Sequence, residues 1–263
     1  MKQAGTGLLR KDFSKVSSKI QRFISDYLTS SRAKGLVIGL SGGLDSAVAL
    51  QLCANAVGTG KISALILPTT STPDGDVSDA ISHASSLGVK YQIINIDPLV
   101  ESYSKALPAA DDKTRGNLTA RIRMSILYYL AASWNSLVIG TSDKSEIWIG
   151  YFTKYGDGGS DLMPLADLYK TQVRELAKHL AVPRGIIEKK SSPHLWPRQL
   201  AEEELGMDYN TMDPILCCLI DKKMKPQQAA KKLRISLKKV KKVESIVKAS
   251  THKRNMPPTA RTT

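Results

Sequence analysis

Compact apolar runs alternate with longer amphipathic segments through the first half of the chain. Each run has the length and composition of a buried strand, and the runs occupy residues 35–40, 62–67, 91–96 and 136–140. The amphipathic segments repeat apolar residues at helical spacing, and they occupy residues 13–28, 46–57, 75–87, 98–106 and 117–134. Strands that alternate with helices predict an α/β fold, a Rossmann-like parallel sheet with helices on both faces. Ligands of such sheets bind at the carboxyl ends of the strands.

The pattern becomes less regular towards the C-terminal half. The polar segment 108–115 is predicted to be a loose loop, and residues 151–161, rich in glycine and aspartate, a second irregular loop. Further helices are expected at residues 168–180, 212–220, 226–233 and 237–247. We therefore expect a single domain, residues 1–263, with a core at about 12–180 and C-terminal helices at about 181–263.

Positive charge is concentrated in the expected C-terminal helices. The chain has 263 residues and a formal charge of +14, and residues 222–254 hold 13 lysines and arginines against one acidic residue, Glu244. Such a segment can attract RNA or polyphosphate, or form a solvated face. It lacks the interleaved aromatic side chains that stack on bases, so we expect a solvated face and no nucleic-acid partner.

Cysteine usage and hydropathy exclude several classes of protein. The three cysteines, Cys53, Cys217 and Cys218, form no CxxC pair, which argues against a disulfide framework or a zinc site. No apolar run is long enough to span a bilayer, and the first residues lack the apolar stretch of a secretory signal. These features predict a cytoplasmic protein that has no membrane partner.

The first expected strand leads directly into the sequence Ser41-Gly-Gly-Leu-Asp-Ser46, which a helix follows. Gly42 and Gly43 allow backbone conformations in which successive N–H groups point at one anion, and the helix adds the positive end of its dipole. Asp45 would repel a phosphate unless it binds Mg²⁺ that bridges to that phosphate. Because no lysine follows, as it does in GxxxxGK[ST] loops, the sequence predicts a different kind of pyrophosphate-binding loop.

This loop resembles the signature of the N-type ATP pyrophosphatases. The resemblance implies that ATP is cleaved between its α and β phosphates. An oxygen of the substrate is adenylated, and a nitrogen or sulfur nucleophile then displaces AMP. The loop alone does not distinguish among the synthetases and tRNA-modifying enzymes of this superfamily.

Five later segments narrow the resemblance to the ammonia-dependent NAD synthetases. They are residues 116–124, 140–146, 150–161, 164–174 and 251–254, and the most specific is the sequence YFTKYGDGG that begins at Tyr151. The resemblance extends from the first helix to Lys253, nearly the whole chain. It implies a ligase of NAD biosynthesis that forms a C–N bond. ATP adenylates deamido-NAD, and ammonia then attacks the adenylate to give NAD, AMP and pyrophosphate.

The resemblance also assigns site residues. The expected ATP-binding residues are Gly39, Leu40, Ser41, Gly42, Gly43, Leu44, Asp45, Ser46, Thr141, Lys170 and Ser192. The expected deamido-NAD-binding residues are Arg121, Lys154, Asp161, His252 and Lys253. Arg121 and Arg123 could each grip a phosphate, and the family pattern favours Arg121.

The chemistry expected from this resemblance needs positioning and charge rather than a protein nucleophile. Asp45 and Glu146 are the expected Mg²⁺ ligands. Lys170 is expected to offset the charge that grows on the leaving pyrophosphate, and no side chain is expected to act as a nucleophile. The family also implies a homodimer with substrate sites at its interface.

Two stretches depart from the family pattern. Ser142-Asp143 stands where Gly-Asn is more usual. Residues 191–202 replace a differently composed loop that is expected to order over bound substrates, so the contacts of Ser192 can differ from the family's. The positions expected to bind phosphate, metal and substrate are all retained, so we expect an active enzyme.

Two other functions remain open from the sequence. A tRNA-thiolating or lysidine-forming member of the superfamily would suit the basic C-terminal helices, but CxxC pairs are absent and residues 154–161 match the NAD synthetases. A non-catalytic nucleotide- or RNA-binding module would not need Asp45 and Glu146, which are present. RNA affinity that falls steeply with added salt would favour either alternative.

Overall fold

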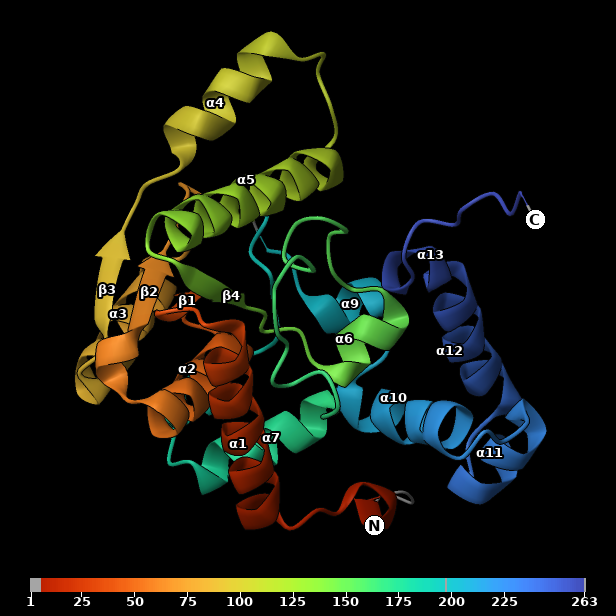
Figure 1. Cartoon of the computed structure of the whole chain (residues 1–263). Helices are drawn as coiled ribbons and strands as arrows, with labels where there is room; N and C mark the ends of the chain where they lie inside the picture. The colour runs from red at the N-terminus through yellow and green to blue at the C-terminus, as the bar shows by residue number, and fades with distance from the viewer. Residues whose placement is uncertain (1–5, 197, 263) are drawn as a thin grey trace.

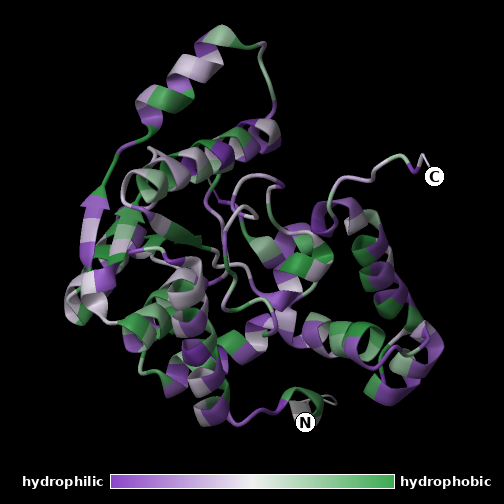
Figure 2. Ribbon diagram, viewed as in Figure 1, coloured by the Kyte–Doolittle hydropathy of each residue, from purple (hydrophilic) through white to green (hydrophobic). Residues whose placement is uncertain are grey.

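The centre of the protein is a parallel sheet of four strands. A computed structural model describes residues 6–196 and 198–262, and its strands are β1 (Gly35–Gly39), β2 (Ile62–Ile66), β3 (Lys90–Ile93) and β4 (Ser136–Ile139). Their order is β3-β2-β1-β4, with Val37 of β1 paired to Ser63 on one side and Val138 on the other (Figure 1). The edge strand β3 is mostly hydrophilic (Figure 2) and exposed. The parallel sheet expected from the alternating runs is confirmed, although β3 ends earlier than expected.

Helices cover both faces of this sheet. The helices on one face are α1 (Phe13–Ser31), α2 (Leu44–Val57), α3 (Asp74–Leu87), α7 (Lys170–His179) and α8 (Arg184–Ile187). Helix α5 (Asp112–Ser133) covers the other face, and α4 (Asp97–Ala106) packs against α5. Side chains alternate along β1, so Leu36 and Ile38 pack in the first layer and Val37 in the second. Full burial of each such side chain contributes about 1.5–3 kcal/mol to stability.

Two helices begin earlier than their apolar periodicity indicates. Asp111 accepts a hydrogen bond from the Thr114 amide at 2.8 Å and so caps α5, which includes residues expected to be a loose loop. Helix α2 begins at Leu44 rather than at Ser46, which places Asp45 in its first turn. Helix α5 extends beyond its apolar face, because polar residues can form a first turn, whereas α2 begins with the buried Leu44.

The C-terminal helices form a second core. They are α9 (Ala201–Leu205), α10 (Tyr209–Leu216) with its π-helical extension Cys217–Asp221, α11 (Pro226–Leu233), α12 (Leu237–Ala249) and α13 (Thr251–Arg254). Tyr209, Met212 and Val240 are buried together with Ile149 and Tyr169, which belong to the region before α7. The second core therefore joins the C-terminal helices to the part of the chain that carries the site.

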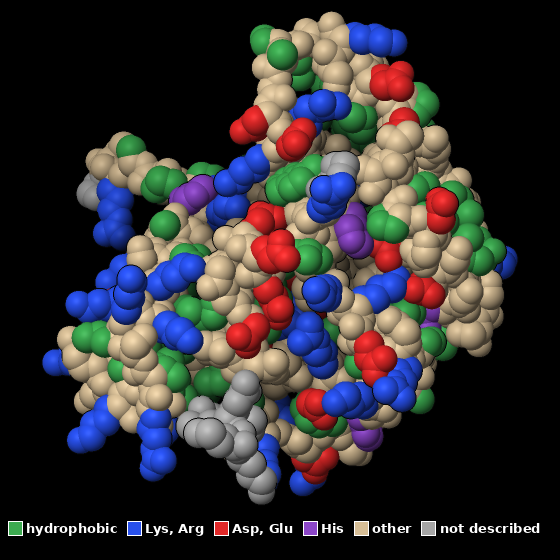
Figure 3. Space-filling model, turned by 180° about the vertical axis from the view of Figure 1, so that it is seen from behind, with side chains coloured by type: hydrophobic (Ala, Val, Ile, Leu, Met, Phe, Trp, Pro, Cys, Tyr) green, Lys and Arg blue, Asp and Glu red, His purple; other side chains and the backbone are tan. Residues whose placement is uncertain are grey.

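The basic side chains of α11 and α12 point outward. Lys231, Lys238 and Lys241 are exposed, while Val240 and Val243 of α12 are buried. Figure 3 shows lysine and arginine side chains gathered over this edge of the molecule, at the left of the view. Within the described residues, none of the helices is both long and apolar enough to cross a bilayer.

Candidate active site

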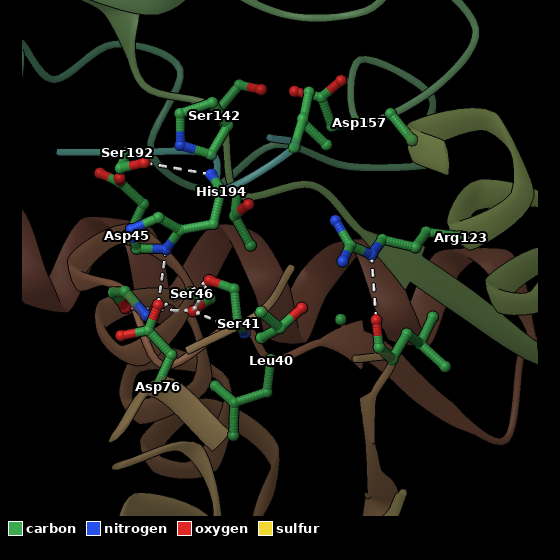
Figure 4. A pocket seen from close by; sticks show the side chains of 18 of the residues that line it. Leu40, Ser41, Asp45, Ser46, Asp76, Arg123, Ser142, Asp157, Ser192 and His194 are labelled. Carbon is green, nitrogen blue, oxygen red and sulfur yellow. Dashed lines mark hydrogen bonds and ion pairs between the residues drawn. The ribbon is translucent and has the colours of Figure 1, made fainter. Parts of the chain in front are cut away.

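A cavity of about 280 Å³ opens at the carboxyl ends of β1, β2 and β4. Its walls are the loop after β1, the segment after β4, part of α5 and residues 189–195 (Figure 4). Nine of the residues expected to bind ATP line it: Gly39, Leu40, Ser41, Gly43, Leu44, Asp45, Ser46, Thr141 and Ser192. Glu146 lines it as well. The cavity thus lies where the carboxyl-end rule for parallel sheets places a ligand.

The loop after β1 lines the cavity, and its shape is fixed by a glycine and by internal hydrogen bonds. Gly42 has a φ of 74°, and a Cβ atom there would lie 2.0 Å from the carbonyl oxygen of Asp76, so no other residue fits. Ser46 Oγ accepts the Ser41 amide at 3.2 Å and donates to the Gly43 carbonyl at 3.1 Å. Gly43 is the N-cap of α2 and offers no side chain to its first turn. The N–H groups of that turn can therefore bind an anion.

Lys170 lies behind this loop, enclosed by three carboxylates. Its ammonium is 2.6 Å from Asp45 Oδ2, 2.7 Å from Glu146 Oε1 and 3.0 Å from Asp143 Oδ2. The side chain of Lys170 is 0% exposed, as is that of Asp143. Residues more than 100 positions apart in sequence, Asp45 and Glu146, thus meet at one ammonium.

The electrostatics of this cluster favour charged Lys170. Burial opposes its charge, but attraction by Asp143, Asp45 and Glu146 outweighs burial and holds the pKa of Lys170 well above its usual value. Burial, together with repulsion between the carboxylates, raises the pKa of Asp143 and brings the pKa of Glu146 to about 7. Asp143 and Glu146 therefore hold protons more readily than free carboxyls do, because one ammonium does not balance three carboxylates.

A short helix that the apolar pattern did not predict, α6 (Lys144–Ile149), positions Glu146. Asp143 Oδ1 accepts the Glu146 amide at 2.8 Å, and Glu146 Oε2 accepts the Asp143 amide at 3.3 Å. This reciprocal pair is a capping box, which fixes the start of α6. Ser145 contributes from the same turn, because its hydroxyl accepts the Lys170 amide at 2.9 Å and anchors the start of α7.

Residues 189–195 close one side of the cavity through ionic contacts with α3. Lys189 Nζ is 2.6 Å from Asp76 Oδ1 and 2.6 Å from Asp79 Oδ2, and it donates to the Gly42 carbonyl at 3.0 Å. His194 Nδ1 is 2.7 Å from Asp76 Oδ2 (Figure 4). Buried Asp76 therefore links residues 189–195 to the loop after β1. The sequence did not predict this contact, because the contact joins α3 to the irregular segment that follows α8.

Ser192 lines the cavity, but its hydroxyl forms hydrogen bonds within its own loop. It donates to the Gln199 carbonyl at 2.6 Å and accepts the His194 amide at 3.1 Å. The side-chain oxygen of Gln199 accepts the Leu195 amide at 3.0 Å, so the loop is closed upon itself. Ser192 can still offer lone pairs to a ligand, but its proton is engaged.

A second group of expected residues lies away from this cavity. Arg121 Nη2 donates to the Lys154 carbonyl at 3.3 Å, and Lys154 Nζ donates to the His252 carbonyl at 2.9 Å. Lys253 Nζ donates to the carbonyls of Gly150 and Phe152 at 2.8 and 2.7 Å. Four of the five residues expected to bind deamido-NAD are thus brought together from α5, the glycine-rich loop and α13.

Asp161, the fifth residue expected at the substrate, is engaged with the sheet. Its Oδ2 accepts the Val138 amide of β4 at 2.7 Å, and its Oδ1 accepts the Tyr128 hydroxyl at 3.2 Å. His252 and Lys253, expected beyond the last helix, instead lie in the short helix α13. These contacts give Asp161 and Lys253 a role in holding loops whatever they bind.

Arg123, rather than Arg121, lines the main cavity. Its Nε donates to the Leu67 carbonyl at 3.1 Å, at the end of β2 (Figure 4). The two arginines are two positions apart on a helix and so point to different sides. Both arginines were candidates from the sequence, and helical geometry alone could have shown that they serve different surfaces.

Comparison with known proteins agrees with this geometry. The sequence model of the family described as NAD synthase matches residues 16–257. The NH(3)-dependent NAD(+) synthetase of Hyperthermus butylicus is 49% identical over 95% of this chain and 92% of its own. Two solved structures are similar over 95% of this chain. They are the NMN synthetase of Francisella tularensis (TM-score 0.84, 35% identity, 99% of that chain) and the NH3-dependent NAD synthetase of Campylobacter jejuni (TM-score 0.82, 31% identity, 100% of that chain).

The match covers the elements that build the site. It includes β1 and its glycine loop, the acidic cluster around Lys170 and the C-terminal helices α9 to α13, which share a core with the site. It also fits the α/β sheet with its cavity at the strand ends. The chain belongs to the NAD synthase family.

Proposed function

We propose that this chain amidates deamido-NAD with ammonia, consuming ATP and releasing NAD, AMP and pyrophosphate. Membership of the NAD synthase family makes it a ligase of NAD biosynthesis that forms a C–N bond. The main structural support for this proposal is that the glycine loop after β1 and the buried cluster of Lys170 with its carboxylates lie at one cavity. The tRNA-modifying and non-catalytic alternatives are not favoured by the relatives.

The residues of the cavity suit an adenylation. The carboxylate of the nicotinate ring attacks the α-phosphorus of ATP, and the bond from that phosphorus to the bridging oxygen of pyrophosphate breaks. The amide groups at the start of α2 hold the departing phosphates, and Lys170 supplies positive charge near them. Ammonia then attacks the acyl carbon, AMP leaves, and the nitrogen loses a proton to solvent. Positioning and charge account for catalysis without a protein nucleophile.

The carboxylates around Lys170 fit a Mg²⁺ ion. Carboxylate oxygens are the ligands this hard cation prefers, and Asp45 and Glu146 both line the cavity. Among the described residues, the buried Asp45 Oδ1 has no hydrogen-bond partner, so it can accept a cation. When bound, Mg²⁺ would neutralise phosphate charge.

Arg121, Lys154, His252 and Lys253 are proposed to hold the dinucleotide at its far end. Arg121, Lys154 and Lys253 present positive side chains from α5, the glycine-rich loop and α13, which suits the two phosphates of deamido-NAD. We further propose a homodimer, because large apolar side chains on α4 and α5 are exposed. The cytoplasmic location stays a prediction.

The decisive test is product analysis with purified protein. Incubation with ATP, Mg²⁺, ammonium and deamido-NAD should yield NAD and equimolar AMP by liquid chromatography. A parallel reaction with the corresponding deamidated mononucleotide is needed, because an NMN synthetase is among the similar structures. Formation of amidated mononucleotide in preference to NAD would change the substrate assignment, and formation of neither product would remove the proposed activity.

A further inference from the structure

Asp143 is a buried carboxylate that the proposed reaction does not yet use. Its Oδ1 caps α6, but its Oδ2 faces the cluster, 3.0 Å from Lys170 Nζ, and makes no hydrogen bond among the described residues. Asp45 Oδ1 is the second buried carboxylate oxygen in the cluster without such a partner. Asp143 Oδ2 is compensated only by its ion pair with Lys170, and Asp45 Oδ1 has neither an ion pair nor a hydrogen bond among the described residues. Buried carboxylate oxygens without donors cost free energy, which fits a cation that both oxygens can bind.

The charge of the cluster points to the same conclusion. Asp45, Asp143 and Glu146 bring three carboxylates to the single ammonium of Lys170. If all are ionised, two negative charges remain, which is the charge that one divalent cation balances. One oxygen from each carboxylate lies within 4.8 Å of the others, a spacing that a single hard cation can bridge with small movements.

We propose that Asp143 is a third protein ligand of the cation site and that Lys170 competes with the cation for these carboxylates. The inference rests on the proposed cation site of Asp45 and Glu146 and extends it by one ligand and one competitor. Lys170 and a divalent cation bind the same oxygens, so each weakens the binding of the other. Cation binding and the availability of the Lys170 charge are then parts of one equilibrium.

The capping role of Asp143 can be separated from its charge. Asparagine is as good an N-cap as aspartate, so Asp143→Asn keeps the start of α6 while it removes one negative charge. Asp208 offers a matched control, because it caps α10 by accepting the Thr211 amide at 2.8 Å and is exposed. Asp208→Asn makes the same chemical change at an exposed cap whose carboxylate is not one of the three around Lys170.

The experiment measures Mn²⁺ binding to the full chain without ATP, by electron paramagnetic resonance of the unbound ion. Asp143→Asn should weaken binding at least about tenfold, whereas Asp208→Asn should leave it unchanged. Lys170→Gln should bind Mn²⁺ several-fold more tightly than the native chain, because the competitor is gone. The double variant K170Q/D143N should likewise bind more tightly than D143N, which repeats the comparison if K170Q alone folds poorly.

Each outcome has a separate meaning. Glu146→Gln reports on the underlying site: if neither it nor Asp45→Asn weakens Mn²⁺ binding, the cation site itself is wrong. If both weaken binding but Asp143→Asn matches the native chain, Asp143 is a helix cap and the third ligand is refuted. If removal of the Lys170 charge weakens binding or leaves it unchanged in both backgrounds, the competition is refuted.

Discussion

Asp45 belongs at once to a helix start, to the cavity wall and to the cluster around Lys170. It stands in the first turn of α2, it lines the cavity, and its Oδ2 is 2.6 Å from Lys170 Nζ. Asp45→Asn keeps the size of the side chain but removes a cation ligand, so kcat should fall at least about tenfold. Steady-state assay of NAD formation measures this. Asp74→Asn, an exposed aspartate at the start of α3, is the control and should behave as native; equal rates for D45N and D74N would remove the proposed role.

The buried His83 of α3 should make the free energy of unfolding depend on pH. It is 2% exposed, its Nε2 lies 3.1 Å from the Ala47 carbonyl of α2, and its Nδ1 has no partner among the described residues. Burial lowers the pKa of His83 despite the bond to Ala47, so the folded chain binds a proton there less readily than the unfolded chain. Its contribution is present above the ordinary value of 6.5 and is lost as pH falls from 6.5 through the lowered pKa.

Urea unfolding of the native chain and of His83→Gln at pH 7.5 and 5.5 tests this sign. The glutamine amide can still donate to Ala47 but does not titrate. The difference in unfolding free energy, native minus variant, should therefore be smaller at pH 5.5. A difference that is equal or larger at pH 5.5 would show that His83 is protonated in the folded chain.

The sequence predicted single site residues better than it predicted their partners. The resemblance placed Asp45 and Glu146 at one cation site and Lys170 at the leaving pyrophosphate; the fold brings the three side chains together, and their roles stay predictions. Asp76, Lys189 and His194 were missed, since nothing in a linear pattern shows that α3 lies beside the segment after α8. Asp143 was noticed as a departure, but its contact with Lys170 requires the folded positions of α6 and α7.

At the scale of elements, the segment that closes the cavity depends on a glycine of α5. A Cβ atom on Gly116 would lie 2.8 Å from Leu195 Cβ and 3.3 Å from Trp196 Cε3. In an isolated helix, alanine would be more favourable than glycine by about 1 kcal/mol. Gly116→Ala should therefore leave the fold stable while it displaces this segment, and the KM for ATP should rise several-fold.

A control substitution at a second helical glycine tests whether the effect is specific to Gly116. Gly75 lies in the first turn of α3, and a Cβ atom there meets nothing within 4 Å. Gly75→Ala should leave the KM for ATP at the native value. An unchanged KM in G116A, with native melting temperature, would mean that the segment does not contact ATP.

The sequence predicted helices and strands well where apolar residues repeat over a long segment. It predicted them poorly where a capping side chain determines the first residue of a helix. The four strands and the long helices follow from patterns that tertiary packing reinforces. The start of α5 depends on Asp111 and that of α6 on the Asp143–Glu146 box, and neither has an apolar face that marks its first turn. The short helices α8, α9 and α13 were also missed, because helices of four or five residues are too short to show an apolar periodicity.

At the scale of the whole molecule, α4 and α5 leave an apolar surface uncovered. Helix α4 extends away from the body beyond α5 (Figure 1), and Leu99, Tyr103 and Leu107 are 45, 49 and 52% exposed. Tyr129 on α5 is 73% exposed. Large apolar side chains gathered in this way are typical of protein interfaces. The proposed homodimer would bury them against a second copy.

This surface and the proposed dinucleotide site share helix α5, which links assembly to substrate binding. Arg121 and Tyr129 are eight residues apart, about two turns, so they lie on neighbouring faces. Tyr129→Asp should convert a dimer to a monomer in size-exclusion chromatography with light scattering, and the KM for deamido-NAD should rise more than the KM for ATP. Met256→Asp, at an 86% exposed position in the C-terminal tail, adds the same charge elsewhere and should stay dimeric. A native chain that runs as a monomer, yet is fully active, would refute both the dimer and the coupling.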